Sequence, residues 1–246
     1  MLREEVTLSF QVLFLNREMM VERMQEVFKQ LEEWDYLQKL WEEKSGYKKI
    51  LPSTFENQDG KVDIFFYENV EIQSKISGRY DFDTSDFMLC CTQGYHVYHD
   101  IRFICKNIKE YEKRLDQFLE MLLDNLTPEK PREAGFFMRR KELVNWRLAG
   151  LEEKIGNFTR YIQPPNFFGT VNGAVVVLDY SDFSQANQFS VFYNKMRDDF
   201  YAERRVKGEL QQISEFDCKT LDELDEIIKT LPEILEKIEQ LSADKS

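Results

Sequence analysis

Residues 103–110 read Phe-Ile-Cys-Lys-Asn-Ile-Lys-Glu, and residues 216–223 read Phe-Asp-Cys-Lys-Thr-Leu-Asp-Glu. The two stretches lie 113 positions apart and share the pattern Phe-x-Cys-Lys-x-Ile/Leu-x-Glu. The same shift aligns residues 52–124 with 165–237 without a gap. Fifteen of these 73 positions are identical, whereas chance gives about four or five. We therefore predict that the chain contains two copies of one fold unit.

The first copy has a strand-rich centre after Pro52, where short runs of β-branched and aromatic residues alternate with turn signals. A Gln93-Gly94 pair is typical of a hairpin tip. Asn107 then stands before apolar residues at helical spacing and is expected to cap a closing helix. The predicted strands are four, at residues 62–67, 72–82, 87–92 and 95–105.

The segment before this centre contains apolar residues at three- and four-residue steps. This period predicts a helix over residues 17–44, which Asn16 caps and Gly46 ends. Apolar residues at every second position from Val6 to Phe14, which alternate with Thr7, Ser9 and Gln11, predict a leading strand that has no counterpart in the second copy.

The second copy is expected to repeat this order. We predict a helix near residues 133–156, strands from about 166 to 218, and a closing helix to about 241. Thr220 is the expected cap of the closing helix, and Pro232 should kink it.

These elements predict the α+β class, as a tandem duplication of a helix, a four-stranded antiparallel meander and a helix. We expect the two units to pack as a pseudo-dimer. The predicted domains are residues 1–127, which include the leading strand, and residues 128–246.

Composition narrows the function. The chain has 246 residues and a net charge of −12, distributed as −8 over residues 1–127 and −4 over residues 128–246. Such acidity disfavours a nucleic-acid-binding module and a polybasic membrane-surface protein. Glu4 and Glu5 stand where a signal peptide would be apolar, and no apolar stretch suffices for a membrane span. Four cysteines do not suggest a disulfide scaffold, so we expect a reduced, cytoplasmic protein.

Catalytic motifs are scarce. His96 and His99 are the sole histidines, and no nucleophile elbow, Walker loop or dinucleotide-binding glycine motif occurs. We expect no cofactor. The alternative to a non-catalytic protein is an enzyme with a carboxylate and tyrosine site in a cleft between the two units. The candidate cleft residues, which also serve as candidates for partner binding, are identical in both copies: Tyr80, Asp86, Tyr193 and Asp199.

The sequence also offers a candidate metal site and a candidate nucleic-acid contact as alternatives. Cys91, His99 and Cys105 could form a zinc site, although alternation along strands directs neighbouring side chains to opposite faces, so we expect no metal. The stretch 197–207 interleaves basic and aromatic residues, a pattern that can hold single-stranded nucleic acid. Its candidate contacts are Arg197, Tyr201, Arg204 and Arg205, but nearby acidic residues oppose that use.

The sequence thus favours a non-catalytic, acidic, cytoplasmic binding protein that acts on a protein partner with a basic surface. An inhibitor, an immunity protein and a chaperone-like adaptor are the roles that fit. The alternatives are the enzyme described above and a structural subunit of a larger assembly.

Overall fold

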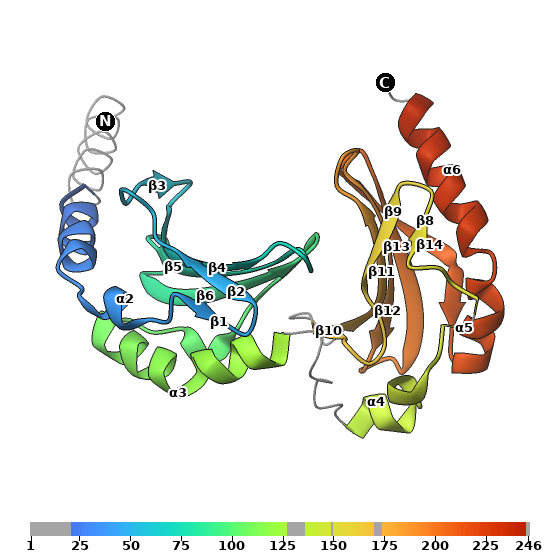
Figure 1. Cartoon of the computed structure of the whole chain (residues 1–246), viewed down its shortest axis with the longest axis horizontal. Helices are drawn as coiled ribbons and strands as arrows, with labels where there is room; N and C mark the ends of the chain where they lie inside the picture. Colours follow the sequence, from blue (N-terminus) through green and yellow to red (C-terminus); the bar gives the residue numbers. More distant parts are fainter. Residues whose placement is uncertain (1–20, 127–135, 149, 170–173, 245–246) are drawn as a thin grey trace, which may run out of the picture.

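The computed structural model describes residues 21–126, 136–148, 150–169 and 174–244. It contains two antiparallel sheets of seven strands each, together with helices (Figure 1). The predicted α+β class is therefore confirmed. Among the described residues, no helix is both long enough and apolar enough to cross a membrane.

The first half comprises residues 21–126. Residues 21–32 are helical, and the sheet order is β1-β2-β4-β5-β6-β7, with β3 paired to β4. Helix α3 lies under this sheet (Figure 1). The elements are α2 Tyr36–Lys39, β1 Glu43–Lys44, β2 Tyr47–Ile50, β3 Asn57–Gln58, β4 Lys61–Asn69, β5 Ser74–Asp81, β6 Asp86–Gln93, β7 His96–His99, the 3-10 helix η1 Ile101–Phe103 and α3 Ile108–Leu126.

The second half comprises the described residues from 136 to 244. Its sheet order is β8-β9-β11-β12-β13-β14, with β10 paired to β11, which is the order of the first sheet. Helices α5 and α6 cover one face (Figure 1). The elements are α4 Phe136–Arg140, the 3-10 helix η2 Leu143–Asn145, β8 Lys154–Ile155, β9 Phe158–Ile162, β10 Phe168–Gly169, β11 Ala174–Asp182, β12 Asn187–Asn194, β13 Asp199–Val206, β14 Glu209–Cys218, α5 Leu221–Ile228 and α6 Leu231–Asp244.

The central strands of the two halves correspond at the shift of 113. β4 and β11 begin and end 113 positions apart, as do β5 and β12, and β6 and β13. A register irregularity between Asp63 and Phe65 recurs between Val176 and Leu178. Ser85 and Asp198, also 113 apart, both adopt positive φ before the third of these strands. The equivalent residues therefore adopt the same backbone conformation.

The predicted meander is present as β4–β7 and as β11–β14, but the prediction of four strands in each sheet is wrong, because each sheet has seven strands. The additional strands have two to five residues, too few to show a period of two. The predicted helix over 17–44 is too long, since the helix ends at residue 32. Gly46 ends no helix but lies in the β1–β2 turn at φ +79°, where glycine is favoured.

The predicted helix over 133–156 is also wrong where the structure describes it. That stretch contains only the short α4 and η2 before strand β8 begins at Lys154. The leading strand over 6–14, the Asn16 cap and the proposed boundary at residues 127 and 128 lie outside the described residues.

The predicted caps of the closing helices are confirmed. Asn107 Oδ1 accepts a hydrogen bond from the Glu110 N–H, which caps α3. Thr220 and Glu223 form a reciprocal capping box at α5. Pro232 is the second residue of α6, after a break that separates α5 from α6; in the first turn its missing N–H leaves no helical hydrogen bond unmade.

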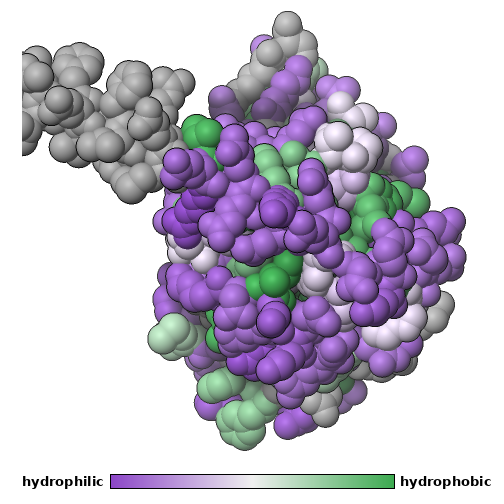
Figure 2. Space-filling model, turned by 90° about the vertical axis from the view of Figure 1, so that its left-hand side faces the viewer, coloured by the Kyte–Doolittle hydropathy of each residue, from purple (hydrophilic) through white to green (hydrophobic). Residues whose placement is uncertain are grey.

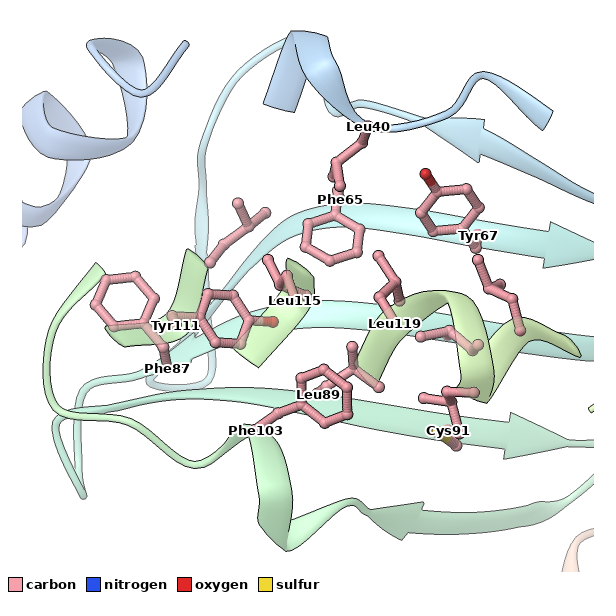
Figure 3. Packing of buried hydrophobic residues seen from close by; sticks show 14 of the residues in the cluster. Leu40, Phe65, Tyr67, Phe87, Leu89, Cys91, Phe103, Tyr111, Leu115 and Leu119 are labelled. Carbon is pink, nitrogen blue, oxygen red and sulfur yellow. The ribbon is translucent and has the colours of Figure 1, made fainter. Parts of the chain in front are cut away.

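The core of the first half lies between its sheet and α3. Phe65 and Tyr67 of β4 face Leu115 and Leu119 of α3 (Figure 3). A second core lies between the second sheet and helices α5 and α6. The first core continues into the second half through Phe168, Val176 and Phe192, among others, so the halves also bury apolar surface against each other.

Candidate functional site

A groove runs between helix α3 and the segment that precedes the first sheet. It encloses about 310 Å³ and presents carboxylates and aromatic rings together. We call this site the α3 groove; its lining residues are Tyr36, Lys39, Leu40, Trp41, Glu112, Asp116 and Glu120.

The carboxylates occur every fourth residue of α3, a spacing that lines one helix face. Trp34 Nε1 donates to Glu112 Oε2 at 3.1 Å, and the Tyr36 hydroxyl donates to Asp116 Oδ1 at 2.7 Å. Burial and this bond to Asp116 raise the pKa of Tyr36 well above its usual range. The hydroxyl therefore remains a donor at neutral pH, and it fixes the orientation of the carboxylate.

The outer part of the groove remains accessible. The side chain of Glu120 is 55% exposed and pairs with Lys44 Nζ at 2.5 Å. Trp41 is 39% exposed, and Asp116 is also exposed. Exposed carboxylates beside an indole ring are suited to bind a lysine or arginine side chain.

The second half has a groove in the equivalent place, of about 450 Å³, in which two carboxylates and two basic side chains balance, whereas the α3 groove has three carboxylates and only Lys39. Trp146 Nε1 donates to Asp225 Oδ1 at 2.5 Å, which repeats the bond of Trp34 to Glu112. Lys229, however, lines this groove at the position equivalent to Asp116. The concentration of carboxylates is therefore specific to the α3 groove.

The contact between the halves contains a buried polar network. Asp179 of β11 is fully buried. Its Oδ2 accepts hydrogen bonds from His96 Nε2 at 3.0 Å, Gln188 Nε2 at 2.7 Å and Ser190 Oγ at 2.8 Å. A carboxylate can only accept, so Nε2 of His96 carries the hydrogen. The network ties β7 of the first half to β11 and β12 of the second.

This network is no catalytic triad. The Ser190 hydroxyl lies 3.3 Å from the same Nε2 that donates to Asp179. A triad requires the aspartate at one ring nitrogen and the nucleophile at the other. The His96, Asp179 and Ser190 arrangement therefore supports the contact between the halves.

The contact is head to tail. Strand β7 at one end of the first sheet order meets the face of the second sheet, where His96 packs against Phe192 and Tyr98 against Phe168. A two-fold pseudo-dimer would instead join equivalent surfaces. The described contact therefore differs from the predicted arrangement.

The candidate tyrosines lie in different cores. Tyr80 belongs to the core of the first half, and its hydroxyl accepts from Arg23 Nη2 at 3.2 Å. Tyr193 belongs to the core of the second half and donates to Asp198 Oδ1 at 2.7 Å. Burial and this hydrogen bond raise the pKa of Tyr193. Both rings therefore pack in the core of their own half.

The candidate aspartates make separate ion pairs. Asp86 Oδ1 lies 2.9 Å from Lys106 Nζ, and Asp199 Oδ1 lies 3.2 Å from Arg197 Nε. Each pair joins residues of one half, so the structure offers no support for a single cleft built from the four candidates.

The potential zinc ligands are divided between two faces. Cys90 pairs with His99 across β6 and β7, and Cys91 pairs with Tyr98. Cys91 and Cys105 face the core, whereas His99 shares the other face with Cys90. Within the described part of the chain, no three His, Cys, Asp or Glu side chains gather as a metal would need.

The candidate nucleic-acid contacts are also divided. Tyr201 and Arg205 project from β13 on the side of the first half, where Arg205 packs over the Tyr95 ring. Arg204 projects from the opposite face and donates to Gln211 Oε1, and Arg197 pairs with Asp199. The four residues therefore do not form one basic strip.

Sequence reasoning missed both sites described above. The spacing of Glu112, Asp116 and Glu120 is visible in the sequence and could have indicated an acidic helix face. Nothing comparable connects His96 to Asp179, which are 83 residues apart.

A scan against protein-family models, a search of curated proteins and a search of solved structures each found no match.

Proposed function

We propose that this chain is a non-catalytic, acidic binding protein of the cytoplasm, and that its partner is a protein with a basic surface. An inhibitor, an immunity protein and a chaperone-like adaptor all act in this way. The observation that carries the proposal is the α3 groove, where accessible carboxylates adjoin an exposed indole ring.

Chemistry favours a basic side chain as the occupant. Each carboxylate has two oxygens, and the bonds from Trp34 and Tyr36 each use a single oxygen of Glu112 and Asp116. Lys44 of the chain itself pairs with Glu120 and lies over the Trp41 ring, 5.4 Å from its centroid, so this place accepts an ammonium group. A guanidinium or ammonium group of the partner could pair with the exposed Asp116 and share Glu120 with Lys44. The net charge of −12 would accelerate the encounter with such a partner.

The surface around the first half agrees with a polar contact. Figure 2 shows that the face farther from the second half is largely hydrophilic, with hydrophobic side chains in small, separate groups. Broad apolar patches are typical of permanent interfaces. A polar face instead suits a partner that binds through charge.

The proposed architecture is a tandem duplication with domains at 1–127 and 128–246. The shared strand order and the matching register irregularities support it. The Trp–carboxylate bonds at equivalent places support it as well. On this proposal the two grooves began alike, and their charges then diverged.

The test compares two variants that each lose two negative charges. Asp116→Asn combined with Glu120→Gln changes the α3 groove, and Glu233→Gln combined with Glu236→Gln changes exposed positions of α6. Proteins bound in cells are cross-linked to each variant and identified, and the purified partner is then titrated calorimetrically at low and high salt.

We expect a basic partner that the groove variant binds at least tenfold more weakly, with the α6 variant unaffected. Equal loss in both variants would indicate general charge attraction and would refute the role of the groove. Failure to recover any protein partner would refute the proposed class.

A further inference from the structure

A second hollow lies at the contact between the two halves, apart from the α3 groove. It encloses about 230 Å³, below the range of about 300–1,000 Å³ that drug-sized ligands occupy. We call it the junction hollow; its lining residues are Tyr95, His96, Val97, Gln188, Phe192, Tyr201, Glu203, Arg205 and Leu210.

Two of the residues that line the junction hollow are held in place by hydrogen bonds to a buried carboxylate. His96 and Gln188 both line the hollow and both donate to the buried Asp179 carboxylate. Their exposed fractions are 8% and 3%. Because these side chains are fixed by buried hydrogen bonds, the hollow has a defined shape before any ligand enters.

Two opposite charges line the hollow without pairing to each other. Glu203 and Arg205 are two positions apart on β13 and therefore share a face. No ion pair within 4.0 Å joins them, and among the described residues none donates a hydrogen bond to the Glu203 carboxylate. Burial raises the pKa of Glu203, while His96 and Arg205 act in the opposite direction. Among the side chains that the structure describes, this carboxylate therefore has no hydrogen-bond donor, which a partly buried charge requires.

Arg205 is likewise incompletely satisfied. Its Nη1 donates to the Gly208 carbonyl at 2.8 Å, and its guanidinium packs over the Tyr95 ring, 5.1 Å from the centroid. Its Nε is buried and has no acceptor within the described part of the chain. These contacts orient the guanidinium at the wall of the hollow, where its positive charge can meet an anion.

The remaining walls are apolar. Tyr201 stacks on Phe192 with ring centroids 4.9 Å apart and planes 9° apart. Val97 and Leu210, at 52% and 53% exposed, stand among the lining residues. An aliphatic or aromatic group could therefore bury surface here while its charged end meets β13.

We propose that the junction hollow binds a small zwitterion, namely a free α-amino acid with an apolar side chain. Its ammonium group pairs with Glu203, its carboxylate pairs with Arg205, and its side chain packs against Phe192, Tyr201 and Leu210. Residues two apart on a strand are separated by about 7 Å, which leaves room for the two charged groups of one α-carbon between them. This proposal is independent of the protein partner at the α3 groove.

The test uses the whole chain and isothermal titration calorimetry. L-leucine, L-methionine and L-phenylalanine are the probes. 4-Methylpentanoate lacks the amino group of leucine, and 3-methylbutylamine lacks its carboxylate. We expect at least one amino acid to bind with Kd below about 1 mM. Analogues lacking either charge should bind at least about tenfold more weakly, since a hydrogen-bonded charge is lost.

Variants provide a second, matched measurement. Glu203→Gln and Arg205→Gln should each weaken binding about tenfold or more. Arg204→Gln removes the same charge as Arg205→Gln from the opposite face of β13 and should bind like the unmodified chain. Because the analogues are tested on the unmodified chain, a folding defect in a variant cannot decide the result.

Three outcomes would overturn the proposal. The first is that none of the three amino acids binds with a Kd below about 1 mM. The second is that the analogues lacking one charge bind as tightly as leucine. The third is that Arg204→Gln weakens binding as much as Arg205→Gln does.

Discussion

Replacing Asp179 by alanine should be among the most destabilising single changes in this protein. Asp179 is fully buried and accepts hydrogen bonds from His96, Gln188 and Ser190 on one oxygen. Ser181 donates to the other oxygen at 2.8 Å. Alanine would leave all four donors without this acceptor in a buried place.

The magnitude follows from these contacts. Each buried donor left unsatisfied costs about 1–3 kcal/mol, although the costs within one network do not add. Hydrogen bonds to a charged group contribute about 1.5–3 kcal/mol each. We therefore expect Asp179→Ala to lower the free energy of unfolding by about 3–5 kcal/mol. Asp179→Asn retains one acceptor oxygen and should lower it less.

Urea denaturation followed by circular dichroism measures the change. The control is Asp63→Ala, which removes a partly exposed carboxylate paired with Arg79; such a pair contributes about 0–1 kcal/mol. A loss below about 1 kcal/mol for Asp179→Ala, comparable with this control, would refute the view that the network stabilises the contact between the halves.

Three further predictions concern single positions. A Cβ at Gly78 would lie 2.2 Å from Phe65 Cε1, so Gly78→Ala should lower the free energy of unfolding by about 1–3 kcal/mol in a urea titration. Gly169→Ala, where a Cβ would meet no described atom within 4 Å, is its control, and equal effects would contradict the packing. Thr220→Ala removes the capping box of α5 and should lower the same free energy by about 0.5–2 kcal/mol; an unchanged midpoint in thermal denaturation would argue against it. Burial raises the pKa of Cys218 to about 11, so the thiolate fraction near pH 8 is small and iodoacetamide should label this thiol slowly there, with a rate that rises steeply above pH 10. Mass spectrometry at a series of pH values measures that rate, and labelling at pH 8 as fast as that of an unfolded peptide thiol would contradict the shift.

The central strands were predictable because they are rich in β-branched and aromatic residues and because the two halves agree at a shift of 113. β4, β5 and β6 recur 113 positions later with the same lengths. The strands before β4 were not predictable, since β2 reads Tyr-Lys-Lys-Ile and β1 has two charged residues. Their pairing depends on neighbouring backbone, which has no signature in such short stretches.

The prediction of a helix over residues 17–44 was wrong because tertiary contacts end the helix early. Its apolar period continues past residue 32, but Trp34 and Tyr36 bind carboxylates of α3 instead of extending the helix. Helical propensity is a weak preference, and long-range contacts override it. The α3 groove exists because of this break.

The network at the contact between the halves was not predicted, because comparison of the two halves reveals only the residues that they share. Phe66 and Glu209 occupy the positions equivalent to Asp179 and His96, so no residue pair in the alignment indicates the network. Its members come from opposite halves and meet only after both sheets have formed.

The head-to-tail contact between the halves also bears on self-assembly. A contact between unlike surfaces does not close on itself, and copies joined in this way can extend into a filament. A second contact of this kind would use β14, the strand equivalent to β7, against the first sheet of another copy. That contact would need a histidine at the position of His96, but β14 has Glu209 there. On the first sheet, Lys75 and Arg79 replace the Gln188 and Phe192 that receive β7. These differences between the two halves therefore disfavour a further contact of the same kind.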